Sequence, residues 1–290
     1  MATLRRVLIA LLLTALVAGG VLAVIVVLYD YDARPLPLAD QCVARVSGES
    51  VALDTDQAHY ASIITGVATQ RGLVPRAATI GLATAYQESG LHNLDYGDRD
   101  SLGLFQQRPS QGWGTQAQVQ DPWYASNRFY AALVKVDGWQ TGDVNDVAQA
   151  VQRSGHPNGY QRHVENARRV ASSLTGETPA SFSCLVKDPP TADPHGFETF
   201  AEKTLPESVT VTRHADRVTV RARTNRAAWS AAQIAVANTA RFGVARVTVG
   251  DQSWTASRTE LAPWTGEKDD ALVAEVWFDV APTPPPTPTR

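Results

Sequence analysis

One acidic side chain stands alone in an apolar stretch of the sequence. Between Arg76 and Asp95, Glu88 is the only residue with a formal charge at neutral pH. It comes near the end of an apolar pattern that predicts a helix buried on nearly all sides. Burial and the negative end of the helix dipole both disfavour a carboxylate, so we expect a raised pKa for Glu88. Such a group can act as a general acid near neutral pH; the alternative is a glutamate that points into solvent at the helix end.

The segment after this helix has a composition typical of a carbohydrate-binding cleft. Residues 91–114 read LHNLDYGDRDSLGLFQQRPSQGWG, in which glycines, amide side chains and aromatic rings alternate. Amides hydrogen-bond to sugar hydroxyl and acetamido groups, aromatic rings face pyranose rings, and glycines allow close approach. We therefore expect substrate contacts from Phe105, Gln107 and Trp113.

A second carboxylate would decide between two ways of cleaving a glycosidic bond. An inverting hydrolase needs a carboxylate base roughly 6.5–9.5 Å from its acid, where it activates water. Asp95, Asp98 and Asp100 follow Glu88 in the loop that borders the expected cleft. Asp100 is the best candidate base, because it directly precedes the Gly-Leu-Phe-Gln segment. The alternative for each aspartate is a turn or ion-pair role.

Other chemistries have little support in the sequence. The histidines include no His-x₃-His or His-Glu-x₂-His pair, so we expect no metal site and no cofactor. Neither a Gly-rich phosphate loop nor a Gly-x-Ser-x-Gly elbow occurs. The chain has 26 basic against 29 acidic residues. Nucleic-acid binders usually have a basic surplus, so we expect no nucleic-acid partner.

Helical patterns surround the candidate site. Asp54 and Gln57 form a capping-box pair, Pro75 is placed to open a helix, and Gly90 is placed to end it. No strong strand pattern interrupts the helical spacing outside the glycine-rich stretch, so residues 54–184 are predicted to form a mainly-α domain. Its helices are expected over residues 54–72, 77–89, 121–134, 143–151 and 158–174.

Beyond residue 184 the pattern changes. The proline-rich residues 185–196 predict a linker, and alternating strands then predict a small α+β domain over residues 197–281, with its four tryptophans in the core. Arg217, Arg221 and Arg223 share the polar face of one strand, which is either a docking patch for an anionic polymer or a solvated face. The expected strands cover residues 209–213, 217–223, 244–249 and 272–280, and the helix covers 227–241.

An uncharged run near the N-terminus predicts a membrane anchor. Residues 7–28 carry no charge, and as a helix they would extend about 33 Å, enough to cross a bilayer core. The basic residues of segment 1–6 predict a cytoplasmic N-terminus with the rest of the chain outside; a cleaved signal peptide is the alternative. Residues 29–53 are expected to form a stalk, and residues 282–290 a disordered Pro/Thr tail.

The two cysteines suggest one disulfide. Cys42 and Cys184 lie on either side of the predicted helical domain. Disulfides persist in oxidising compartments, which the expected location outside the membrane provides. A bond between them would tie the ends of that domain together, whereas the alternative is a pair of free thiols.

Two short motifs carry a resemblance to a known family. Glu88-Ser89 at a helix end, followed by Ser101-Leu-Gly-Leu-Phe-Gln106, resembles the Glu-Ser … Gly-Leu-Met-Gln signature of soluble lytic transglycosylases and goose-type lysozymes. Residues 54–175, about 120 of the 290, resemble an actinobacterial branch of this lysozyme-like superfamily. The resemblance implies that Glu88 is the catalytic acid and that Gln106 lines the cleft.

A third motif of the family is altered. The transglycosylases carry an Ala-Tyr-Asn-Ala-Gly motif on a later helix, and the nearest string here is Ala150-Val-Gln-Arg-Ser-Gly155. Gln152 stands in place of the asparagine and Val151 in place of the tyrosine. The resemblance implies a substrate-binding role for Gln152, and Tyr160 is a candidate for the missing aromatic side chain.

The function implied by the resemblance is that of a membrane-anchored muramidase. It would cleave the β-1,4 bond between N-acetylmuramic acid and N-acetylglucosamine in peptidoglycan strands, by transglycosylation with Glu88 as acid and then base. The alternatives are an inverting hydrolase that uses Asp100, and a non-catalytic wall-binding or scaffolding protein.

The expected fold class is a single N-terminal transmembrane helix, a mainly-α lysozyme-like domain and a small α+β domain. The expected location is the cell membrane, through residues 7–28, with the C-terminal domains extracellular. Residues 197–281 are a candidate surface for an envelope protein partner.

Overall fold

The described part of the chain, residues 39–278 of the computed structural model, begins with a β-hairpin. Strands β1 (Gln41–Val46) and β2 (Glu49–Leu53) pair antiparallel. Their connection, Ser47-Gly48, has positive φ at both residues, 53° and 82°, as a two-residue type I′ turn requires. Strand β3 (Phe182–Leu185) pairs with the other edge of β1, so the first sheet has the order β2-β1-β3.

The first sheet carries the disulfide. Cys42 of β1 and Cys184 of β3 are direct register partners, and they form the bond that the sequence suggested. Both residues are buried, and 142 positions separate them along the chain. The bond therefore closes a loop that contains the helices preceding β3.

These helices position the candidate site. Helix α2 (Thr55–Gln70) starts at the predicted Asp54–Gln57 capping box. Helix α3 (Pro75–Ser89) ends at Gly90, whose left-handed φ of 64° confirms the predicted C-cap. The elements that follow are the 3₁₀ turn Pro109–Gln111, α4 (Gln116–Gln120), α5 (Pro122–Leu133), α6 (Val144–Gln152), the 3₁₀ turn Gln161–His163 and α7 (Val164–Leu174).

A second, larger sheet forms the C-terminal part of the described chain. Its strand order is β4-β5-β8-β6-β7, and every neighbouring pair is antiparallel. The elements are α8 (Pro194–Thr204), β4 (Thr210–His214), β5 (Arg217–Arg221), α9 (Asn225–Ala237), α10 (Thr239–Phe242), β6 (Arg246–Val249), β7 (Gln252–Thr255) and β8 (Val273–Trp277).

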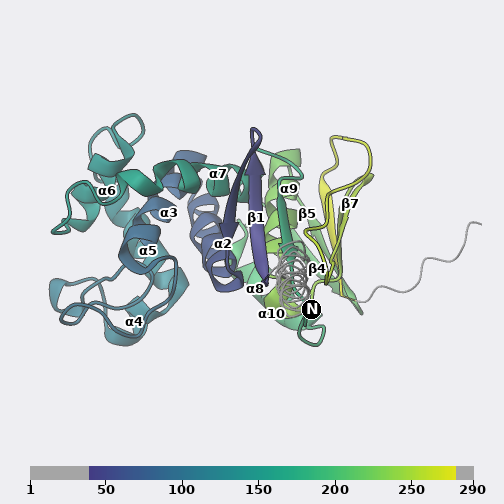
Figure 1. Ribbon diagram of the computed structural model, residues 1–290, viewed down its shortest axis with the longest axis horizontal. Coiled ribbons are helices and arrows are strands. Elements are labelled where there is room, and N and C mark those ends of the chain that lie inside the picture. Colours follow the sequence, from purple (N-terminus) through teal and green to yellow (C-terminus); the bar gives the residue numbers. More distant parts are fainter. Residues whose placement is uncertain (1–38, 279–290) are drawn as a thin grey trace, which may run out of the picture. The chain divides into compact units, whose positions relative to one another are not determined.

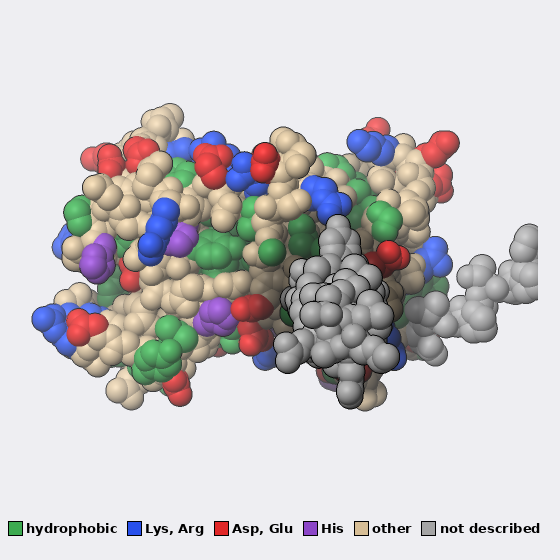
Figure 2. Space-filling view, in the orientation of Figure 1, with side chains coloured by type: hydrophobic (Ala, Val, Ile, Leu, Met, Phe, Trp, Pro, Cys, Tyr) green, Lys and Arg blue, Asp and Glu red, His purple; other side chains and the backbone are tan. Residues whose placement is uncertain are grey.

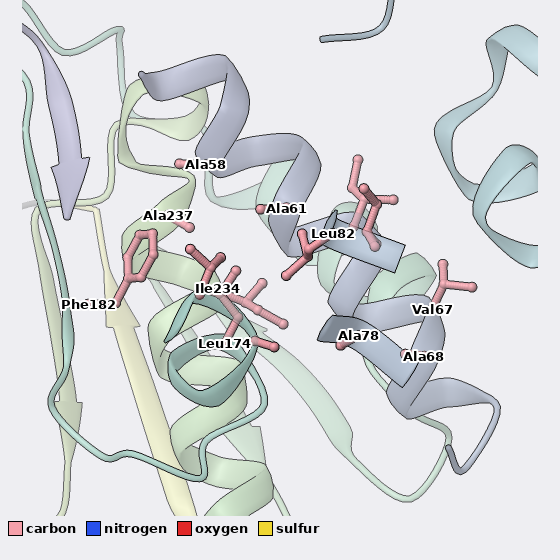
Figure 3. Close-up of a cluster of buried hydrophobic side chains, with 14 of the residues drawn as sticks. Ala58, Ala61, Val67, Ala68, Ala78, Leu82, Leu174, Phe182, Ile234 and Ala237 are labelled. Atoms are coloured by element: carbon pink, nitrogen blue, oxygen red, sulfur yellow. The ribbon is translucent and has the colours of Figure 1, made fainter. Parts of the chain in front are cut away.

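Helix α9 lies between the helices and the larger sheet (Figure 1). It packs against β5, β6 and β8 of that sheet, and also against β3, α2 and α7. Residues 228–237 are all buried, and half of them are alanines, whose short side chains let the neighbouring elements approach closely. Figure 3 shows Ile234 and Ala237 of α9 beside Phe182 of β3 and Leu174 of α7.

Two tryptophans hold β3 to the C-terminal part. The indole Nε1 of Trp254 donates to Ser183 Oγ at 3.1 Å, and that of Trp264 donates to the Phe182 carbonyl at 2.9 Å. Trp229 and Trp254 are fully buried, as predicted, whereas Trp264 and Trp277 are half-buried. Side chains from the C-terminal part therefore contact the first sheet directly.

The predicted fold class needs correction. Residues 39–278 form a mixed α/β structure with two sheets around a continuous core, instead of a mainly-α domain followed by a separate α+β domain. Within this described range, no helix is long and apolar enough to cross a membrane. The predicted anchor, 7–28, lies outside the described residues, as do residues 1–6 and the tail 282–290.

The physical reason lies in the pairing of distant strands. The predicted stalk, 29–53, contains β1 and β2, which are short, and β1 has three consecutive buried residues instead of an alternating pattern. The second partner of β1, β3, comes more than 130 residues later, and periodicity within a segment carries no information on such a pairing.

A buried polar network joins α2 to α9. His59 Nδ1 lies 2.6 Å from Asn238 Oδ1, and Asn238 Nδ2 donates to Ser62 Oγ at 3.0 Å. Because Asn238 also donates Nδ2 to the Ile234 carbonyl, its Oδ1 faces His59, so His59 Nδ1 carries the proton. Burial is the main cause that lowers the pKa of His59 from 6.5 to about 4.

The His59 pKa makes stability depend on pH. In the unfolded chain His59 binds a proton near pH 6.5, whereas in the folded protein it does so only near pH 4. The stabilisation is therefore fully present above pH 6.5 and is lost as the pH falls from 6.5 to about 4. We expect a loss of about 3 kcal/mol in the free energy of unfolding, from 1.36 kcal/mol per pKa unit. Urea unfolding from pH 7 to 4 measures it. His59→Gln should flatten the dependence, whereas the exposed His195→Gln should not; equal slopes would contradict the assignment.

The disulfide is expected to contribute strongly to stability. Closing a loop of this length restricts the unfolded chain by an amount worth about 5 kcal/mol in the chain-entropy model. We expect the double substitution Cys42→Ser and Cys184→Ser to lower the free energy of unfolding by most of this amount, as measured in urea. Wild-type protein under reducing conditions should match the variant. Equal stability of oxidised and reduced wild type would contradict the expectation.

Candidate active site

Glu88 occupies the last turn of α3, where the helix emerges from the core. Residues 77–85 of this helix are all buried, which confirms the predicted apolar surroundings. Glu88 itself is half-buried. The left-handed Gly90 ends the helix two residues later, so the carboxyl group lies at the boundary between the core and the loop that follows.

Two predicted site residues stabilise the charged form of the Glu88 carboxyl. The Tyr160 hydroxyl donates to Glu88 Oε1 at 2.6 Å, and the Gln152 side chain also stabilises the charged form. Burial nevertheless has the largest effect, and it raises the pKa of Glu88 above its usual value. Burial and the nearby Glu88 raise the pKa of Tyr160 as well, so its hydroxyl keeps the proton that it donates.

Hydrogen bonds from neighbouring residues fix the backbone around this carboxyl. Ser89 Oγ donates to the Leu104 carbonyl at 2.8 Å, and Gln152 Nε2 donates to the Phe105 carbonyl at 2.7 Å. The end of α3, the 101–107 segment and the end of α6 therefore meet beside Glu88. Sequence reasoning did not assign a role to Ser89, although the Glu-Ser motif contained the signal.

The 101–107 segment is a tight loop with unusual backbone conformations. Leu102 and Gln107 form an isolated antiparallel bridge, and Gly103 and Gln106 between them have positive φ. A Cβ atom on Gly103 would lie 2.3 Å from the Val119 carbonyl oxygen, so only glycine fits there. Gln106 Nε2 donates to the Tyr96 carbonyl at 3.2 Å, which directs this side chain toward the 94–101 loop.

Three of the predicted substrate-binding residues lie inside the protein: Phe105, Gln107 and Tyr160. Phe105 is fully buried, with its ring stacked on Phe129 at a centroid distance of 4.6 Å. Gln107 is 2% exposed, and its Nε2 donates to the Ala125 carbonyl. Both side chains attach the loop to α5 and leave no surface for a sugar. Trp113 is half-buried and lines a groove together with Gln152.

The candidate base Asp100 already takes part in an ion pair and in hydrogen bonds within the protein. It accepts hydrogen bonds from Arg108 Nε at 2.8 Å, from the Ser110 backbone N–H at 2.7 Å and from Ser110 Oγ at 3.0 Å. The Arg108 side chain and then Ser110 hold the pKa of Asp100 well below its usual value. A carboxylate with such a low pKa is a weak base. The other two candidates, Asp95 and Asp98, are exposed.

Histidines lie near the site. Figure 2 shows histidine side chains (purple) close to acidic side chains (red) on the face over the helical elements. His92 Nε2 is 2.9 Å from Asp54 Oδ2 at the start of α2. His156 is close enough to Glu88 to lower the Glu88 pKa slightly through its charge, an interaction that sequence reasoning missed. Among residues 39–278, no group of three or more His, Cys, Asp or Glu side chains is placed to bind a metal ion.

A separate cavity of about 660 Å³ lies near the other end of α3. Pro75, Arg76 and Thr79 line it. Glu88 follows Pro75 by 13 residues on the same helix, which corresponds to about 20 Å. This cavity is therefore not part of the Glu88 site.

Comparison with known proteins gives no assignment: no family model matches the chain, and no curated protein matches its sequence significantly. The reactions that the site could carry out are therefore inferred from its geometry. A half-buried carboxyl with a raised pKa, oriented by a tyrosine and an amide, is suited to donate a proton to a ligand at the surface.

The Tyr160–Glu88 hydrogen bond makes a testable prediction. Because the hydroxyl stabilises the carboxylate, Tyr160→Phe should raise the pKa of Glu88 further while leaving its burial in place. A ¹³C NMR titration of the Glu88 carboxyl measures the shift. The exposed Tyr96→Phe is the matched control and should leave the pKa unchanged. An unchanged or lower Glu88 pKa in Tyr160→Phe would show that the hydrogen bond does not favour the charged form.

Proposed function

We propose that this protein is a peptidoglycan-cleaving muramidase with Glu88 as its general acid. The observation that carries the proposal is the half-buried Glu88 carboxyl, whose pKa is raised by burial and which is oriented by Tyr160 and Gln152. Its place beside the Gly-Leu-Phe-Gln loop supports the resemblance to lytic transglycosylases and goose-type lysozymes. The substrate is then the β-1,4 bond between N-acetylmuramic acid and N-acetylglucosamine.

In the first step, Glu88 donates its proton to the glycosidic oxygen. The bond between this oxygen and the muramoyl C1 breaks, and the N-acetylglucosamine side leaves with a free 4-hydroxyl. The substrate's own acetamido group stabilises the positive charge that develops on C1. Tyr160 keeps the carboxyl in one orientation and stabilises the carboxylate that the step creates.

In the second step, the Glu88 carboxylate accepts the proton of the muramoyl 6-hydroxyl. The oxygen of this hydroxyl bonds to C1, which gives a 1,6-anhydro product, and Glu88 ends the cycle protonated. No water is consumed, and one carboxyl group serves as acid and then as base.

The state of Asp100 favours this route over inverting hydrolysis. An inverting enzyme needs a second carboxylate that can accept a proton from water. Asp100 is ion-paired with Arg108 and its pKa is lowered, so it is poorly suited to this task. A mechanism that needs Glu88 alone is therefore the better supported one.

Muropeptide analysis tests the proposal. The purified protein is incubated with peptidoglycan and the products are identified by mass; we expect 1,6-anhydro ends. Glu88→Gln should lower the rate by about 100-fold or more, the usual contribution of a general acid. The exposed Glu202→Gln is the matched control and should retain full activity.

Two results would overturn parts of the proposal. Reducing ends that disappear in Asp100→Asn would indicate hydrolysis with Asp100 as base. Release of no product by the wild-type protein, together with sedimentation on peptidoglycan, would indicate a non-catalytic binding protein. Activity that survives Glu88→Gln would remove Glu88 from the role of acid.

A further inference from the structure

A groove of about 430 Å³ borders the Glu88 site on the side of α5 and α6. Gln152 belongs to its wall and also stabilises the Glu88 carboxylate. The groove and the candidate acid therefore share Gln152 as a neighbour. The half-buried Trp113 and the exposed Gln111 also line it. An aromatic ring with amides on either side is suited to a sugar ring and its polar substituents.

The groove also concentrates positive charge. Arg128, Lys135 and Arg153 line it, and no carboxylate belongs to its lining. Within residues 39–278, none of the three forms an ion pair with Asp or Glu. The whole chain has a formal net charge of −3. Three cations without a carboxylate in one groove are therefore a local feature rather than the consequence of a basic protein.

One of these cations, Arg128, is held by backbone carbonyls. Arg128 donates from Nε to the Trp113 carbonyl at 3.3 Å and from Nη2 to the Gly112 carbonyl at 3.0 Å. Its guanidinium therefore fixes the loop that presents the Trp113 ring.

Arg153 is the C-cap of α6 and has a left-handed φ of 54°. Glycine or asparagine adopts this conformation more readily, and such local strain is common where a side chain serves a binding site.

We propose that this groove is a subsite for the carboxylates carried by the muramoyl side chain of the glycan. The inference rests on the proposed function and names the part of the substrate that is recognised beside Glu88. Trp113 faces a sugar ring, Gln111 and Gln152 bind its hydroxyl or acetamido groups, and Lys135 and Arg153 bind carboxylate. The carboxylates belong to the stem peptide or, where the stem has been removed, to the lactyl group.

Binding to insoluble peptidoglycan tests the subsite without turnover. The full chain carrying Glu88→Gln is sedimented with the glycan at low salt, and its apparent Kd is compared with that of the same protein carrying also Lys135→Gln and Arg153→Gln. Loss of two charge-assisted contacts should weaken binding about tenfold or more. The difference should shrink at high salt because ions screen exposed charges. The matched control carries Arg246→Gln and Arg258→Gln, two exposed cations on the C-terminal part, and should bind as before.

Three forms of the glycan identify the carboxylate. Intact peptidoglycan presents stem carboxylates, amidase-treated glycan presents only the lactyl carboxylate, and carbodiimide-amidated peptidoglycan presents neither. The Lys135 and Arg153 substitutions should matter for the form that carries the recognised group and not for the amidated form.

Equal weakening in the Arg246 and Arg258 control, no weakening in the groove variant, or undiminished binding of amidated glycan would overturn the subsite. Cleavage by the wild type alongside any of these results would leave the proposed function standing. The expected binding pattern without any cleavage would remove the catalytic role and leave the carboxylate site.

Discussion

The burial of residues 228–237 of α9 is the constraint on which the described structure depends. Helix turns without a solvent face need neighbours on every side, and α9 obtains them from the larger sheet, from β3 and from α2 and α7. At Gly176, after α7, an added Cβ would lie 2.0 Å from the Arg226 carbonyl oxygen, so the approach to α9 leaves no room for a side chain. Helix α3 packs on α2 and α7. The position of Glu88 is therefore fixed by contacts that reach back to α9.

Two opposing effects act on the pKa of the Glu88 carboxyl. Loss of water favours its neutral form, whereas the donors of Tyr160 and Gln152 favour the charged form. Burial has the larger effect, so the pKa of Glu88 lies above its usual value although both donors oppose the shift. Such a balance suits a group that gives up a proton and takes one back in a single cycle.

Local features could be predicted from the sequence, whereas long-range pairings could not. The Asp54 capping box, the Gly90 C-cap and the isolation of Glu88 are encoded within a few residues, and the structure has them. The partners of β1 and the burial of Phe105 depend on segments far away in the chain. The segment whose composition suggested a sugar cleft therefore contains buried side chains, Phe105 and Gln107, that attach the 101–107 loop to α5.

The disulfide also changes what a cut in the chain would do. Because Cys42 and Cys184 join strands on either side of the helices, the residues between them form a closed covalent ring. A protease that cleaves once in the exposed 95–99 loop opens this ring but releases no fragment. The two pieces stay one molecule until the bond is reduced, with Glu88 and Tyr160 on opposite sides of the cut and still tethered. Resistance to fragmentation in a protease-rich environment would thus come from connectivity, independently of how often the loop opens.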